Sequence, residues 1–231
     1  MNPANQTPED RFAAELRGFG PIGILAILVI ILTGNIVLSN MLVLPVGAVL
    51  VLAWVRLSHT AWKEIGYIKP GNWIVTIVGG FAFGIAFKFL MKAIVLPLTG
   101  ADPVNHTYHF LAGNKALLPM AILAMFTVGF AEETVFRGFM FERLGKLIGP
   151  GFLKKSLIIL ITSVWFGFSH YYGQGTYGVV QATIFGFIFG TIYSYTGKIW
   201  LLIFAHTAFD LIALAMIYWD LETSVAHLIF K

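Results

Sequence analysis

Long apolar stretches recur along this chain of 231 residues and constrain its fold more than any other feature. A helix needs about 20 apolar residues to cross the hydrocarbon core of a bilayer. Seven segments reach or approach that length: 21–38, 41–57, 73–98, 117–139, 153–170, 179–195 and 199–218. Lipid offers the backbone no hydrogen-bond partner, and no alternating barrel pattern is present. The sequence therefore predicts an all-α helix bundle.

The composition supports a membrane location for these helices. The chain is 58% hydrophobic and 11% charged, whereas soluble domains carry roughly 25% charged residues. We predict a polytopic integral membrane protein with about seven transmembrane helices (six to eight), in the cell (inner) membrane. Residues 1–20 form a polar tail, and residues 21–231 form one transmembrane domain whose catalytic core is about 117–218. Within the tail, 9–19 is either a short interfacial helix or frayed.

The charge balance and the absence of cysteine exclude several classes of function. Fifteen Lys and Arg against eleven Asp and Glu give a net charge of +4. In a membrane protein that excess belongs mainly to cytoplasmic loops, so nucleic-acid binding is not expected. No cysteine means neither a disulfide framework nor a thiolate metal site.

Lys88 and Lys92 lie inside an apolar segment, where they snorkel or pair with a carboxylate, and for Lys92 we expect snorkelling.

Two adjacent glutamates, Glu132 and Glu133, lie inside the fourth apolar segment. Inserting an ionisable group into the bilayer costs at least ~2.5 kcal/mol, and such groups usually mark a functional site. Glu133 and Arg137 are four residues apart and share a helix face, whereas Glu132 points about 100° away. One carboxylate is then neutralised while the other is available as a general base. A structural ion pair near the helix end is the simpler alternative.

Two histidines lie in later apolar segments. His170 follows Phe166 by four residues, and His206 precedes Asp210 by four. A lone histidine in a span is often a hydrogen-bonded structural residue, but a carboxylate on the same face as His206 can fix its tautomer. Two histidines and a carboxylate are also a known catalytic zinc set, although no His-Glu-x-x-His helix is present.

The residue spacing around the turn at Pro150 places Glu132 and His170 at the same level of the bundle. Glu132 precedes Pro150 by eighteen residues, and His170 follows it by twenty. In antiparallel helices that rise ~1.5 Å per residue, both lie near one height. His206 then joins them from the last span. The helix from 117 to 149 exceeds one perpendicular span, so it tilts, breaks near Gly138 or projects from the bilayer.

These three elements resemble the CAAX protease and bacteriocin-processing family, which contains the type II CAAX prenyl endopeptidase and bacterial Abi proteins. The family pattern is Glu-Glu-x-x-x-Arg, then Phe-x-x-x-His, then His-x-x-x-Asn or Asp. The matching residues are Glu132, Glu133 and Arg137; Phe166 and His170; and His206 and Asp210. The resemblance covers roughly residues 121–214.

The resemblance implies an intramembrane glutamate-type endopeptidase without a cofactor, zinc being the alternative. It implies that Glu132 and His170 activate a water, and that Glu133 and Arg137 position Glu132. His206 and Asp210 are implied on the oxyanion side. Because an ionised Asp210 would repel an oxyanion, it is protonated or acts by holding His206.

The predicted partners are a peptide or protein substrate, with prenylation left open, and membrane lipid. The competing interpretations are a proton-coupled small carrier, and a non-catalytic membrane scaffold or immunity protein that kept the fold. A carrier would be favoured by inverted repeats with interrupted helices, which the sequence does not display.

Overall fold

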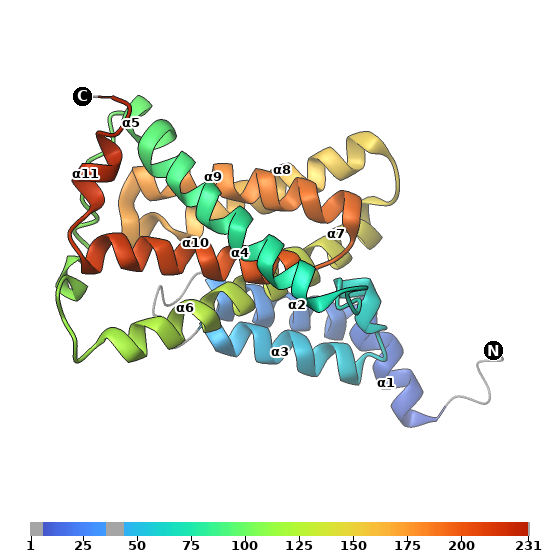
Figure 1. The fold of residues 1–231 in the computed structure, drawn as a ribbon. Helices are drawn as coiled ribbons and strands as arrows, with labels where there is room; N and C mark the ends of the chain where they lie inside the picture. The colour runs from blue at the N-terminus through green and yellow to red at the C-terminus, as the bar shows by residue number, and fades with distance from the viewer. Residues whose placement is uncertain (1–6, 36–43, 231) are drawn as a thin grey trace.

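The computed structural model describes residues 7–35 and 44–230, and every regular element in those ranges is helical (Figure 1). The first elements are α1 (Pro8–Arg17), α2 (Pro21–Asn35), α3 (Leu44–Leu57), the 3₁₀ turn η2 (Trp62–Ile65), α4 (Trp73–Leu90), the π-helical η3 (Met91–Val95), α5 (Leu96–Leu98) and the 3₁₀ turn η4 (His109–Leu111). Then follow α6 (Leu118–Glu133), the π-helical η5 (Thr134–Met140), α7 (Phe141–Ile148), α8 (Phe152–Ser169), α9 (Tyr171–Thr196), α10 (Trp200–Tyr218) and α11 (Glu222–Ala226).

The prediction of an all-α, multi-pass membrane bundle is confirmed, although fewer than seven helices reach full span length. Among the described residues, five helices are long and apolar enough to cross a membrane, or six if the bent pair α1–α2 is one span. The reason is length: α2 and α3 have 15 and 14 residues, short of the about 20 that a span needs. The predicted segments around 36–43 lie partly outside the described residues.

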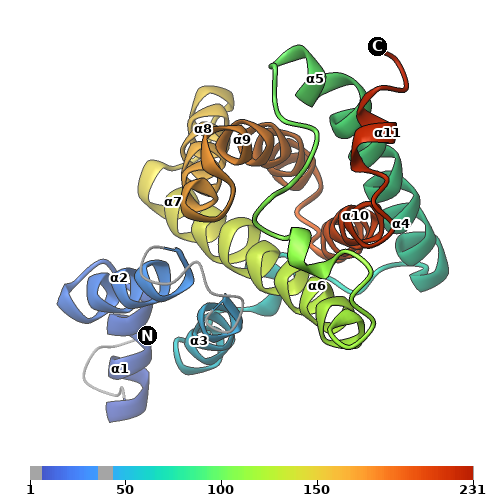
Figure 2. The ribbon, with the colours of Figure 1, turned by 90° about the vertical axis from the view of Figure 1, so that its left-hand side faces the viewer.

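One long helix organises the bundle. The elements α6, η5 and α7 form a single apolar helix of 31 residues, Leu118–Ile148. Figure 2 shows it between α1–α3 on one side and the remaining spans on the other. It does not break near Gly138, because the chain continues there as the π-helical η5. At ~1.5 Å per residue the helix exceeds the ~30 Å hydrocarbon core, so tilting or projection accommodates its length.

Close packing of α4 against α10 depends on glycine. A Cβ at Gly84 would overlap the carbonyl oxygen of Ala205, and a Cβ at Gly80 would lie 2.8 Å from Cβ of Phe204. From Gly80 to Gly84 along α4, the contacted positions also move forward along α10, so the two helices point in the same direction. Small residues that let helix backbones approach are a common packing device in membranes. This pairing fixes the position of α10 along the bundle axis, and α10 carries His206.

We expect Gly84→Ala to destabilise the protein, because the new methyl group meets backbone that cannot turn aside. Overpacking of this kind costs about 1–3 kcal/mol, or roughly 2–12 °C in melting temperature for a chain of this size. Gly79 lies on the same helix, and a methyl group added there would have nothing within 4 Å. Gly79→Ala is therefore the matched control and should leave the melting temperature unchanged or slightly higher. Thermal unfolding in detergent compares the two; equal effects would contradict this account of the α4–α10 contact.

The expectation that Lys92 snorkels to the interface is wrong. Lys92 is 5% exposed, and its Nζ lies 2.9 Å from Oε1 of Glu222, which is also buried. The helix α11 folds back against η3 and brings this carboxylate over the lysine (Figure 1). The contact joins residues 130 positions apart, so local spacing could not predict it.

The turn residues at 172–176 interrupt a helix but do not end one. Helix α9 begins at Tyr171 rather than near 179 and runs to Thr196. Inside it, Gly175 has a non-helical backbone, with φ 63° and ψ −162°. A positive φ has little steric cost only for glycine, so the glycine at position 175 determines where the helix kinks. It leaves one helical turn directly after His170.

The N-terminal segment forms the helix α1, in agreement with the helical alternative for 9–19. Thr7 caps it through a reciprocal capping box with Asp10. The helix is attached to the bundle: Trp54 Nε1 donates to the carbonyl oxygen of Leu16 at 3.0 Å, and Arg17 pairs with Glu64 at 2.7 Å.

Candidate active site

The two adjacent glutamates end α6, where the helix widens into η5. Glu132 is 6% exposed and Glu133 is fully buried, although ideal helical spacing separates their directions by about 100°. All seven residues of η5 are buried as well, so the widened turn lies inside the bundle. Such π-helical turns are frequent at functional sites. Both carboxylates are therefore enclosed at one level of the central helix.

Glu133 is held by two nitrogen-bearing side chains. Its Oε1 lies 3.1 Å from Nη1 of Arg137 and 2.7 Å from Nδ1 of His206. The i,i+4 ion pair expected from the sequence is thus present. His206 reaches it because α6 and α10 approach closely at Gly129, where a Cβ would lie 2.7 Å from Oγ1 of Thr207. Two partners on one oxygen fix Glu133 in place.

Glu132 and Asp210 face the other nitrogen of His206. Nε2 lies 3.5 Å from Oε2 of Glu132 and 3.5 Å from Oδ2 of Asp210. Since Nδ1 donates its proton to Glu133, the tautomer of His206 is set, and Nε2 is the nitrogen left to face the two remaining acids. Three carboxylates thus meet one imidazole and one guanidinium. This surplus of acceptor oxygens suits removal of a proton from water.

Phenylalanine rings enclose the charged groups. The guanidinium carbon of Arg137 lies 4.7 Å from the ring centroid of Phe166 and 5.6 Å from that of Phe189. The ring of Phe185 lies 4.5 Å from that of His206. Cation–π contacts of this kind are worth more when desolvated. The aromatic walls also lower the local dielectric, which strengthens each charge interaction inside.

His170 lies at the corner between α8 and α9, one aromatic ring from the cluster. Its Nδ1 donates to the carbonyl oxygen of Phe166 at 2.8 Å, which leaves Nε2 with a lone pair in the neutral ring. The ring of Phe166 lies between the two histidines, with centroids 4.7 Å from His170 and 6.1 Å from His206. Among the described residues, no hydrogen bond or ion pair joins His170 to Glu132.

The hairpin predicted around Pro150 forms between the long helix α6–η5–α7 and α8, and it has the expected register. The rings of Phe136 and Phe166 meet with centroids 4.8 Å apart. These residues lie at similar distances before and after Pro150, as the level argument for Glu132 and His170 requires. The structure therefore brings Glu132, Glu133, Arg137, His206 and Asp210 into direct contact and places His170 beside them.

Two tyrosines near the site were not predicted from the sequence. Burial raises the pKa of Tyr108, and the negative charges of Glu132 and Asp210 raise it further. Burial likewise raises the pKa of Tyr67 to about 12, and its hydroxyl lies 2.6 Å from Oγ1 of Thr134. Both lie in connecting segments, where no local spacing marks a tyrosine as functional.

The described residues contain no group of three His, Asp or Glu side chains arranged to hold a metal ion. Nδ1 of His206 is directed at Glu133, so only its Nε2 faces the other acids.

Comparison with protein families gives a match for the segment that carries the cluster. Residues 114–212 match the family model described as type II CAAX prenyl endopeptidase Rce1-like. The match confirms the resemblance seen in the three motifs. It spans every residue of the cluster described above, and the Rce1-like segment comprises α6 to most of α10. The family supports an intramembrane CAAX-type endopeptidase that acts on a peptide or protein in a membrane. No curated protein and no solved structure gave a significant match.

Proposed function

We propose that this protein is a glutamate-type intramembrane endopeptidase in which Glu132 is the general base. The observation that carries the proposal is the different bonding of the two adjacent glutamates. Glu133 Oε1 is bound by Arg137 and His206, whereas Glu132 lies at 3.5 Å from Nε2 of His206. A carboxylate without a short charge-assisted bond is the one free to take a proton.

The proposed reaction begins with a water between Glu132 and His170. Glu132 takes one proton of the water while Nε2 of His170 accepts the other hydrogen as a hydrogen bond. The water oxygen forms a bond to the peptide carbonyl carbon, and the carbonyl oxygen becomes an oxyanion. Glu132 then delivers its proton to the peptide nitrogen, and the carbon–nitrogen bond breaks. No acyl-enzyme forms, so no serine or cysteine nucleophile is required.

The remaining residues position these groups. Arg137 holds Glu133, and Glu133 in turn holds the imidazole of His206. When protonated, His206 offers Nε2–H to the oxyanion, which is electrostatic stabilisation by a preorganised donor. Asp210 contacts that same nitrogen at 3.5 Å, so we assign it to holding His206 rather than to contacting the oxyanion itself.

We propose that the reaction needs no metal ion and takes place in the cell (inner) membrane. The substrate is a peptide or protein segment that reaches the buried site from lipid, and a prenylated CAAX tail is the first probe because of the family match.

Metal removal tests this mechanism. Purified protein in detergent should cleave a fluorogenic prenylated CAAX peptide or a hydrophobic peptide equally well, within about twofold, before and after treatment with a chelator. His170→Ala and Glu132→Ala should both lose cleavage, since each removes a group bound to the water. Loss of activity on chelation with recovery on adding zinc would move the site to the metal class.

A further inference from the structure

A cavity of about 410 Å³ lies at the end of the bundle where α7 meets α8, opposite α5 and α11 (Figure 1). Its walls come from η2, α7, the turn at Pro150, the start of α8 and the end of α9. It shares no residue with the catalytic cluster. The volume is within the range of small-molecule sites, about 300–1,000 Å³, so a ligand with a compact headgroup fits.

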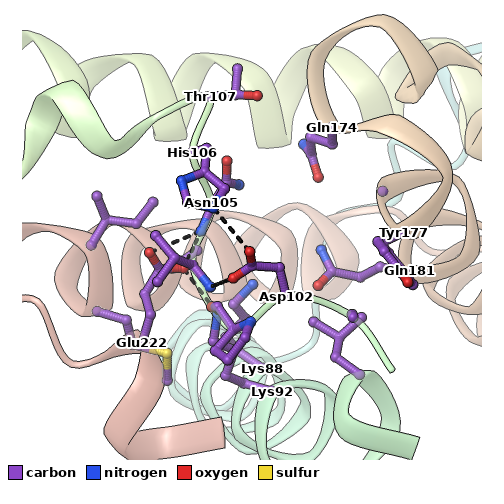
Figure 3. A pocket seen from close by; sticks show the side chains of 18 residues that line it. Lys88, Lys92, Asp102, Asn105, His106, Thr107, Gln174, Tyr177, Gln181 and Glu222 are labelled. Atoms are coloured by element: carbon purple, nitrogen blue, oxygen red, sulfur yellow. Dashed lines mark hydrogen bonds and ion pairs between the residues drawn. The ribbon is translucent and has the colours of Figure 1, made fainter. Parts of the chain in front are cut away.

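A second cavity, between α4, α9 and α11, is lined by lysines that already have acidic partners. Figure 3 shows Lys88, Lys92 and Glu222 around it. Lys92 binds Glu222 at 2.9 Å, and the charges of Asp210 and Glu222 both act on Lys88. The lysines of this second cavity are therefore compensated by acids of the chain itself.

Glu64 and Glu142 line the 410 Å³ cavity, and basic side chains neutralise both. Glu64 lies 2.7 Å from Arg17 and 3.1 Å from Lys146. Glu142 pairs with Arg143 and also with Lys146. Three cations therefore hold two carboxylates, and this network keeps a net positive charge at the cavity wall.

Two further lysines bring positive charge to the 410 Å³ cavity without an acidic partner. Lys63 and Lys155 both line it, and within the described ranges neither forms an ion pair. Lys155 donates one hydrogen bond, to the carbonyl oxygen of Ser194 at 3.3 Å. Together with the network of Glu64 and Glu142, these lysines leave the cavity positive overall, so it suits an anionic ligand.

The N-terminus of α8 adds backbone donors at the same place. This 18-residue helix follows Gly151, its first turn contains no acid, and no side chain caps it. Gly149 and Pro150, which lead into the helix, line the cavity. Free N–H groups at a helix N-terminus bind phosphate and carboxylate groups. Lys155, in the first turn, adds to the positive field there.

Tyr193 independently indicates an acceptor group in this cavity. It lines the cavity and is only 6% exposed, yet its hydroxyl makes no hydrogen bond within the described ranges. Its ring is held edge-on by Phe141, with centroids 5.1 Å apart. A buried hydroxyl without a partner is costly, so an acceptor oxygen in the cavity would satisfy it. Phosphate provides both acceptor oxygens and negative charge.

The apolar surface beside the cavity favours a lipid over a free phosphate ion. Phe152 and Leu153 begin α8 directly after the turn at Pro150, and they are 73% and 80% exposed. Helix α8 is one of the candidate membrane spans, so these side chains suit contact with acyl chains. A choline or ethanolamine group would add a positive charge among the lysines. An anionic headgroup such as that of phosphatidylglycerol therefore fits best.

We propose that the 410 Å³ cavity binds the phosphate of an anionic phospholipid, with Lys63 and Lys155 facing its charge and Tyr193 donating a hydrogen bond. The site is separate from the catalytic cluster, and the proposal does not depend on the proposed function. One bound lipid joins η2, α7, α8 and α9, so its effect is on the stability of the bundle.

Thermal unfolding of the purified protein in detergent micelles tests this site. Phosphatidylglycerol at about ten times its Kd should raise the melting temperature by roughly 3–6 °C. Phosphatidylcholine at the same mole fraction, and inorganic phosphate at the same concentration, should each raise it by less than about 1 °C. Unfolding is measured without substrate, so a protein that cleaves no peptide would fail the proposed function and still decide this proposal.

Variants of the lining residues locate the lipid. Lys63→Gln/Lys155→Gln should abolish the phosphatidylglycerol shift, and Tyr193→Phe should reduce it. Without lipid, Tyr193→Phe should unfold at the wild-type temperature or slightly higher, since the unpaired hydroxyl is gone. The matched control is Lys69→Gln/Lys115→Gln, which removes the same charge from two exposed lysines that do not line the cavity. The control should keep the full shift.

Each of four results would overturn the proposal. No shift with phosphatidylglycerol would mean that no such lipid binds. An equal shift with phosphatidylcholine would mean that the headgroup charge is not recognised, and an equal shift with inorganic phosphate would mean a site for a soluble anion. An unchanged shift in Lys63→Gln/Lys155→Gln would mean that the lipid binds elsewhere.

Discussion

Glu132→Gln is expected to reduce kcat/KM for peptide cleavage by about 10²–10⁴-fold, the usual contribution of a general base. The amide has the shape of the carboxylate but cannot take the proton of the attacking water. Stability should be kept, because Glu132 has no hydrogen bond among the described residues and its contact with His206 is 3.5 Å long. Thermal unfolding in detergent should shift by no more than about 2 °C, a shift that corresponds to less than ~1 kcal/mol.

Two further glutamates provide matched controls for that variant. Glu133→Gln should lose both activity and stability, because Glu133 is bound to Arg137 and His206 in full burial. Glu64→Gln should keep full activity, since Glu64 pairs with Arg17 and Lys146 away from the cluster. If Glu132→Gln remained as active as Glu64→Gln, Glu132 would not be the base, and the assignment of the two adjacent glutamates would be wrong.

Arg137→Met is expected to give the largest loss of stability in the molecule. Arg137 is 1% exposed, and its removal leaves Glu133 with an uncompensated buried charge. Breaking a buried ion pair in this way costs about 3–5 kcal/mol, or roughly 10 °C in melting temperature. The stacking of the guanidinium on Phe166 is lost as well. Cleavage activity should fall with it, since Glu133, which binds Nδ1 of His206, is no longer held by Arg137.

The double variant Glu133→Gln/Arg137→Met tests whether the stability lost in Arg137→Met comes from the unpaired charge of Glu133. Replacing both members of a buried pair avoids the stranded charge. The double variant should therefore be more stable than Arg137→Met alone, while activity stays lost. Additive losses in the double variant would show that the two residues do not form one energetic unit, contrary to the 3.1 Å contact.

The features predicted correctly from the sequence are those that local spacing controls. The apolar segments fix the helices, and four-residue spacing fixes the Glu133–Arg137 and His206–Asp210 contacts. Counting from Pro150 fixes the register of the hairpin between the long helix and α8. Each depends on helix geometry alone.

Contacts between distant segments were not predictable in this way. The bond from His206 to Glu133 joins residues 73 positions apart, and it places His206 against both glutamates. The burial of Lys92 against Glu222 depends on where α11 folds back. The π-helical η5 depends on packing on several sides of the central helix. None of these features follows from a residue spacing or a sequence motif within one segment.

Product analysis in proteoliposomes tests the central claim most directly. Wild type and Glu132→Gln are reconstituted with a hydrophobic peptide bearing a free C-terminus, and the products are identified by mass spectrometry. We predict one new peptide pair from wild type, produced by cleavage near the C-terminus and adding one water across a single bond, and none from Glu132→Gln. The same products from both proteins, or none from either, would contradict a Glu132-dependent intramembrane endopeptidase.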